Sequence, residues 1–101
     1  MKKIALTLTL AALSTSALAA EPAPMSELCP KIAELSRSVM TARQAGVSMR
    51  KVMDVATSPF TVDIITEAYG HPAYTTLEYK EKTIQDFEDQ WYLKCIKSYN
   101  L

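Results

Sequence analysis

The chain has 101 residues, of which 11 are basic, 11 are acidic and 49% are hydrophobic. This length fits one domain and no more, and the apolar share is too high for a disordered tail. The balanced charge excludes the basic excess with which proteins neutralise the phosphates of nucleic acid. The composition therefore predicts one small folded domain without a nucleic-acid partner.

The N-terminal segment has the pattern of a secretory signal peptide. Two lysines stand near its start, the stretch 4–13 is apolar apart from two threonines, and small residues follow. We expect residues 1–19 to be the signal peptide, with cleavage after Ala19 or Ala20. A short membrane anchor is the alternative, although the stretch is shorter than the run of about 20 apolar residues that spans a bilayer.

Removal of this segment leaves a slightly acidic chain. Residues 21–101 hold 9 basic and 11 acidic residues, a net charge of −2, and they contain no further apolar run of membrane-spanning length. We expect a periplasmic or secreted protein without stable membrane insertion. Its expected organisation is an extended leader at 20–26 followed by a single helical domain at 27–101.

The two cysteines, Cys29 and Cys95, predict one disulfide. An even cysteine count in an exported chain favours a bridge, and two cysteines allow a single pairing. A thioredoxin-like role lacks its Cys-x-x-Cys motif, and a zinc site lacks ligands because the chain has one histidine. In the loop-entropy model, closing nearly the whole domain stabilises it by about 4 kcal/mol.

Hydrophobic spacing and punctuation by glycine and proline predict four helices and no sheet. The expected helices cover residues 27–45, 49–56, 59–69 and 76–98. The residues expected to start or end them are Ser26 with Pro30 in the first turn, Gly46, Ser48, Ser58, Gly70 and a Thr75–Glu78 capping box. The predicted fold is all-α: a small bundle of about four helices, two long and antiparallel and two short, closed by one disulfide.

The predicted bridge fixes how the two long helices pair. With Cys29 beside Cys95 the helices run antiparallel, and the small residue Ala33 faces the large Trp91, as good packing requires. The other facing pairs in this register are Ser36–Glu88, Met40–Ile84 and Arg43–Glu81. We expect the last of these to be a partly buried ion pair that acts mainly on register.

No set of residues predicts catalysis, a cofactor or a metal site. His71 is the single histidine, and the sequence identifies neither a nucleophile nor an orienting partner for it. A pH-sensing role for this residue stays open. Met40, Met49 and Met53 either bind copper through their thioethers or fill the core. We expect a non-enzymatic protein that needs no cofactor.

Charge and aromatic residues are unevenly distributed. Residues 21–53 carry a net charge of +2 and residues 54–101 carry −4, so either the first helix complements the last or the surface steers a partner. All eight aromatic residues lie in the second half, and helical projection places Tyr79 and Leu93 on the polar side of the last helix. These two are the candidate partner surface, with ordinary scattered surface apolarity as the alternative.

Three segments carry a resemblance to other sequences: Met-Thr-Ala-Arg-Gln-Ala-Gly-Val-Ser at 40–48, Glu-Ala-Tyr at 67–69, and the ending Phe87, Trp91, Tyr92 and Cys95. With them the chain resembles a set of small exported proteins of Gram-negative bacteria and their phages that have no assigned function. The resemblance implies a helical one-disulfide protein and no activity. More loosely, the plan resembles the periplasmic acid-stress chaperones, at the level of fold alone.

These observations favour a protein-binding module in the periplasm, such as an inhibitor, an immunity or exclusion factor, or a holdase. Its expected partner is another periplasmic or envelope protein. The alternative is a carrier that holds a small ligand or metal between its helices, with methionines and tyrosines as lining. An enzyme is the third interpretation, and the sequence offers it no catalytic set.

Overall fold

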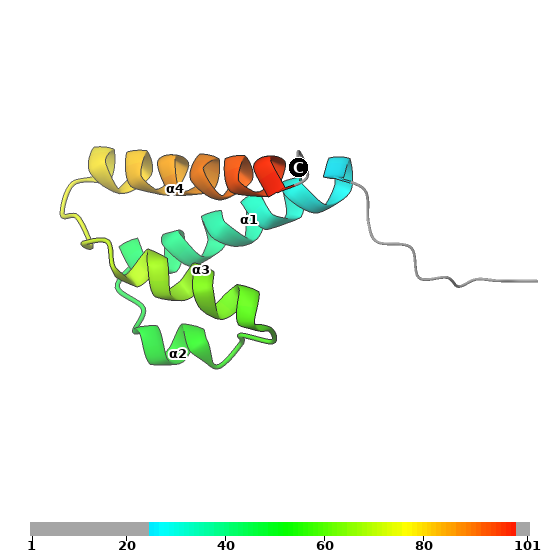
Figure 1. Ribbon diagram of the computed structural model, residues 1–101. Helices are drawn as coiled ribbons and strands as arrows, with labels where there is room; N and C mark the ends of the chain where they lie inside the picture. Colours follow the sequence, from blue (N-terminus) through cyan, green and yellow to red (C-terminus); the bar gives the residue numbers. More distant parts are fainter. Residues whose placement is uncertain (1–24, 99–101) are drawn as a thin grey trace, which may run out of the picture.

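The computed structural model describes residues 25–98, which form four α-helices and no strands. The helices are α1 (Met25–Gln44), α2 (Met49–Met53), α3 (Pro59–Tyr69) and α4 (Leu77–Ser98). In Figure 1, α1 runs between α4 on one side and α3 on the other, and α2 lies beyond α3. The expected all-α bundle of two long antiparallel and two short helices is confirmed.

The two short helices start as predicted. The Ser48 hydroxyl accepts a hydrogen bond from the Lys51 N–H at 3.3 Å, and the Ser58 hydroxyl accepts one from the Thr61 N–H at 3.2 Å. Both serines have extended backbone dihedrals, which is the usual conformation of an N-cap. Pro59 follows at the first helical position, where its missing N–H costs no helical bond.

The long helices start differently from expectation. α1 begins at Met25, so Ser26 lies inside the helix and not at its N-cap, and Pro30 lies in the second turn. Pro30 has no N–H to donate to the carbonyl four residues earlier, so the first turn of α1 is weakly held.

The predicted Thr75–Glu78 capping box is also wrong, because the start of α4 is shifted by one residue. The hydroxyl of Thr76 caps the helix by accepting from the Tyr79 N–H at 3.3 Å. Two adjacent threonines compete for this role, and only the second has a side chain that reaches the third helical N–H. Glu78 therefore lies at a helical position that cannot return a bond to the cap.

The helix ends reflect local backbone hydrogen bonds. α1 stops in a Schellman motif, in which the Val47 N–H donates to the Ala42 carbonyl at 3.0 Å and Gly46 has φ +86°. α2 ends at Met53, earlier than predicted, because the next residues turn more tightly. The Ala56 N–H, for example, reaches back only three residues, to the Met53 carbonyl at 3.0 Å.

The core lies between α1, α3 and α4. Its largest fully buried side chains are Met40 from α1, Ile64 and Ile65 from α3, and Phe87 from α4. The buried residues of α4 are Phe87, Trp91 and Cys95, in its middle and at its end. Its first residue, Leu77, is 70% exposed, because α1 ends before it reaches that turn of α4.

The disulfide and the helix register are confirmed together. Cys29 and Cys95 are bonded with their Cα atoms 5.5 Å apart, which closes a separation of 66 residues. At the other end of the pair, the Lys80 ammonium donates to the Gln44 carbonyl at 2.5 Å. One antiparallel register therefore holds from the bridge to the end of α1.

One facing pair differs in detail. The expected Ser36–Glu88 contact is not made, because the buried Ser36 hydroxyl donates to the Ile32 carbonyl of its own helix at 2.8 Å. Glu88 instead accepts from Arg37 at 2.7 Å. The arginine reaches the rim of the interface from the neighbouring position and keeps its charge in solvent.

Candidate functional site

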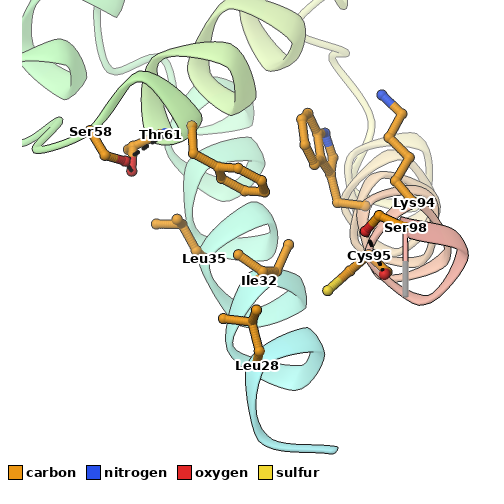
Figure 2. A pocket seen from close by; sticks show the side chains of 10 residues that line it. Leu28, Ile32, Leu35, Ser58, Thr61, Lys94, Cys95 and Ser98 are labelled. Atoms are coloured by element: carbon orange, nitrogen blue, oxygen red, sulfur yellow. Dashed lines mark hydrogen bonds between the residues drawn. The ribbon is translucent and has the colours of Figure 1, made fainter. Parts of the chain in front are cut away.

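An apolar groove lies at the disulfide end of the bundle. Its volume is about 610 Å³. It is lined by Leu28, Ile32 and Leu35 of α1, Ser58, Phe60 and Thr61 at the start of α3, and Trp91, Lys94, Cys95 and Ser98 of α4. Figure 2 shows the three α1 side chains in a row, with the start of α3 on one side and the end of α4 on the other. We call this set of ten residues the groove.

The hydroxyl groups in the groove are satisfied by the protein itself. Ser58 and Thr61 share a hydrogen bond at 3.1 Å, and Ser98 donates to the Cys95 carbonyl at 2.8 Å (Figure 2). The α1 side chains are half-buried, and Phe60 is 44% exposed. The groove thus presents apolar surface, with its hydroxyl groups already paired.

Trp91 forms the deep wall of the groove. It is 8% exposed and makes an edge contact with the Phe60 ring, with centroids 5.5 Å apart. The Lys94 ammonium lies over the indole face, 4.3 Å from the ring centroid. A cation in this position is attracted by the electron-rich face of the ring. Phe60 and Lys94 therefore both pack against the Trp91 ring.

A second hollow, of about 470 Å³, lies behind this wall. Asp63, Thr66 and Glu67 of α3 line it, together with Trp91 and Lys94. The Lys94 ammonium contacts one carboxylate oxygen of Glu67, Oε2, at 3.1 Å. Since Trp91 and Lys94 line both spaces, these two side chains separate the groove from this side hollow.

Two buried polar atoms at this boundary have no hydrogen-bond partner among residues 25–98. They are Nε1 of Trp91 and the other carboxylate oxygen of Glu67, Oε1. Native proteins pair nearly all buried polar atoms, so each exception needs an explanation. One of these atoms is a donor and the other an acceptor.

The predicted partner surface does not form one patch. Tyr79 is 56% exposed and Leu93 is 51% exposed, but they lie about 21 Å apart along α4 at 1.5 Å per residue. The face between them carries the Lys82–Asp86 ion pair at 3.0 Å. Tyr79 also packs on Tyr74, with ring centroids 5.8 Å apart.

The predicted ion pair between Arg43 and Glu81 is not formed in the structure. Arg43 donates from Nε to the His71 carbonyl at 2.9 Å, and its guanidinium lies 5.2 Å from the centre of the Tyr69 ring. Glu81 is exposed. The carbonyl and the ring are both desolvated neighbours for a planar guanidinium, whereas an exposed carboxylate offers little.

Gln44, next to Arg43, holds the segment after α3. Its amide donates to the Pro72 carbonyl at 2.8 Å and accepts from the Tyr74 N–H at 2.8 Å. The His71 ring packs edge-on against Phe87, 5.6 Å between centroids. His71 therefore has a structural contact in the core at this end of the bundle.

The three methionines differ in burial. Met40 is fully buried in the core, Met53 packs against the core, and Met49 is at the surface. Residues 25–98 hold no cluster of three histidine, cysteine, aspartate or glutamate side chains that fits a metal ion. The groove is lined by neither methionine nor tyrosine.

Of the groove residues, the sequence singled out Cys95 for the disulfide, Ser58 as an N-cap and Trp91 for packing, but it did not reveal the groove itself. The spacing of Leu28, Ile32 and Leu35 marks a buried face of α1 without showing that α3 leaves part of that face uncovered. Phe60 offered a signal, since a large aromatic residue in the first turn of a short helix lies where packing partners are few.

Within the described helices, α1 to α4, none combines the length and the apolar character needed to cross a bilayer. No known protein family, curated protein or solved structure matches the chain.

Proposed function

We propose that the chain is an exported, non-enzymatic protein-binding module whose groove takes an apolar polypeptide segment of a periplasmic or envelope partner. The observation that carries this proposal is the groove: half-buried aliphatic and aromatic side chains around a space whose hydroxyl groups are already paired. The signal-peptide pattern and the resemblance to small exported proteins support the location.

The dimensions fit a short segment. From Leu28 to Leu35 the floor of the groove is about 10 Å long, which matches about three residues of extended chain or two turns of helix. Grooves of this kind bind partners through a few apolar anchor residues, and such anchors contribute most of the affinity. The groove therefore replaces the outer face of α4 as the expected contact surface.

The test is selection of random dodecapeptides on the immobilised protein, followed by calorimetry of the recovered peptides. Phe60→Asp places a carboxylate in the groove, and an acidic residue in the first turn of α3 suits the helix dipole, so the variant is expected to fold. Its affinity is expected to fall about tenfold or more. Thermal melts of each variant check the fold.

Matched controls separate the groove from the rest of the surface. Val62→Asp lies on the same helix outside the groove, and the double variant Tyr79→Ala/Leu93→Ala alters the outer face of α4. Both are expected to bind the peptides as the unchanged protein does. Peptides that bind Phe60→Asp equally well, or a failure to recover any apolar peptide, would contradict the proposal.

A small-ligand carrier is the second candidate, favoured by one observation. A volume of about 610 Å³ lies within the range of small-molecule sites. Native mass spectrometry of the protein purified from the periplasm tests it. A retained small molecule that Phe60→Asp releases would favour this candidate, whereas a bare polypeptide mass is expected from the protein-binding proposal.

A further inference from the structure

The boundary between the groove and the side hollow carries a feature that apolar binding alone does not use. Trp91 is nine-tenths buried, yet its indole N–H finds no acceptor among residues 25–98, and Glu67 Oε1 finds no donor. An unpaired buried donor or acceptor destabilises a fold. Two such atoms in residues that line the same hollow indicate a place prepared for an outside group.

The chemistry of these two atoms selects the class of group. A guest must offer an acceptor to the indole N–H and a donor to the carboxylate oxygen. An ionised fatty-acid carboxylate or a phosphodiester offers acceptors only, and the carboxylates of Asp63 and Glu67 in the side hollow repel such an anion. The main chain of a polypeptide offers both, since each residue carries one N–H and one C=O.

Lys94 contacts both residues that carry these atoms. Its ammonium lies over the Trp91 ring, 4.3 Å from the centroid, and 3.1 Å from Glu67 Oε2. Its side chain is nevertheless 52% exposed. An exposed lysine in a single surface ion pair is weakly held, so it can swing into solvent and join the groove to the side hollow.

We infer that Trp91 Nε1 and Glu67 Oε1 bind the main chain of the guest segment, after Lys94 has moved off them. This inference rests on the proposed function. It adds that the protein recognises apolar side chains along α1 and, at the α3–α4 wall, one C=O and one N–H of the peptide backbone. A guest without amide groups therefore loses this part of the interaction.

The experiment uses the full mature protein and the tightest peptide from the dodecapeptide selection. Trp91 is the single tryptophan, so its indole ¹H–¹⁵N signal reports directly on Nε1. The signal is expected to move downfield on peptide binding. Trp91→Phe keeps an aromatic ring and removes the donor, so it is expected to weaken binding roughly three- to tenfold, the effect of one hydrogen bond.

A second readout separates binding from folding. Because Nε1 has no partner in the free protein, Trp91→Phe breaks no hydrogen bond there, and any fall in its melting temperature reports only the smaller buried ring. Tyr92→Phe, on the neighbouring exposed residue, is the control and is expected to change neither property. Lys94→Ala is expected to tighten peptide binding, because the lysine no longer has to be displaced.

N-methylation of the peptide, one residue at a time, tests the acceptor. At one position, N-methylation is expected to weaken binding of the peptide to the unchanged protein. The same methylation is expected to have no effect on binding to Glu67→Leu, which lacks the carboxylate acceptor. An indole signal that stays fixed while Phe60→Asp still abolishes binding would overturn this inference and leave the proposed function standing. Peptides that bind Phe60→Asp as tightly as they bind the unchanged protein would overturn both.

Discussion

The two ends of the bundle are built from the same pair of helices and differ in how completely they are filled. At the end where α1 stops, residues 71–74 close over the core, and Gln44 alone makes hydrogen bonds to Pro72, Tyr74 and Lys80. We call this the closed end. At the disulfide end, α3 approaches only with its first turn, and the groove stays open.

On the proposed function, the difference places stability at one end of the domain and binding at the other. At the closed end the His71 ring packs on the fully buried Phe87, and the side-chain amide of Gln44 is hydrogen-bonded on both sides. At the open end the helices cannot rely on packing of that kind, and a covalent bond between Cys29 and Cys95 joins them instead. The bridge thus allows apolar surface to remain uncovered where a guest is expected to bind.

The largest expected effect comes from breaking the bridge. The double variant Cys29→Ser/Cys95→Ser is expected to lose about 4 kcal/mol of unfolding free energy, because the unfolded chain regains the entropy that a loop of this length removes. Urea titration measures the loss. Reductant should reproduce it in the unchanged protein and have no effect on the variant. A loss below about 1 kcal/mol would show that the open end does not depend on the bridge.

The closed end is tested next by Gln44→Ala. This change leaves the Tyr74 N–H and the Pro72 carbonyl without their partners, and we expect it to cost about 2 kcal/mol. Gln85→Ala, on the exposed face of α4, is the control and is expected to change stability by less than about 0.5 kcal/mol. Equal losses in both variants would mean that the Gln44 network does not hold the closed end.

A smaller effect is expected at Arg43. Arg43→Ala removes the bond to the His71 carbonyl and the contact with the Tyr69 ring, and should cost about 1 kcal/mol by urea titration. Glu81→Ala is expected to be nearly neutral, and the double variant to be additive. A coupling energy between Arg43 and Glu81 in this double-mutant cycle would show that the ion pair predicted from the helix register does form.

The smallest effect concerns alkaline pH. Burial raises the pKa of Tyr69 above its ordinary value of 10.0, while the nearby Arg43 partly lowers it. The folded state therefore favours the neutral phenol, which donates to the Val47 carbonyl at 2.7 Å. The contribution is complete below pH 10.0 and is lost as the pH rises through the raised pKa.

Urea titrations at increasing pH measure this contribution. Unfolding free energy is expected to decline more steeply above pH 10.0 in the unchanged protein than in Tyr69→Phe. Tyr92→Phe, which removes an exposed hydroxyl, should follow the unchanged protein. Identical slopes in all three proteins would show that Tyr69 does not couple the closed end to pH.

The sequence predicted the fold well because its local signals agreed with one another. Ser58 and Pro59 mark the start of α3 and Gly46 marks the end of α1, since caps and left-handed glycines act within one turn of chain. The bridge then set the register of α1 and α4. Errors arose where two local choices were nearly equal, as between Thr75 and Thr76 at the start of α4.

The groove was harder to predict because it exists where α3 leaves part of the apolar face of α1 uncovered. The aliphatic side chains of α1 have the same spacing where they are covered by α3 and where they line the groove. Helical projection showed that Tyr79 and Leu93 point outward, but it could not show that an ion pair lies between them. Partners of Arg43 were missed because one is a carbonyl, which no residue type reveals.

The position of the bridge also bears on how the chain opens and folds. The contact between the start of α1 and the end of α4 joins the segments most distant in the chain, so in a reduced chain it has the largest loop entropy to overcome and is the slowest contact to form. The same contact is then the first to open by local fluctuation, because the polar network at the far end still holds α1 to residues 71–74. Oxidation therefore governs the lifetime of the groove as well as the stability of the fold, and reduction should speed the exchange of amide hydrogens near Cys29.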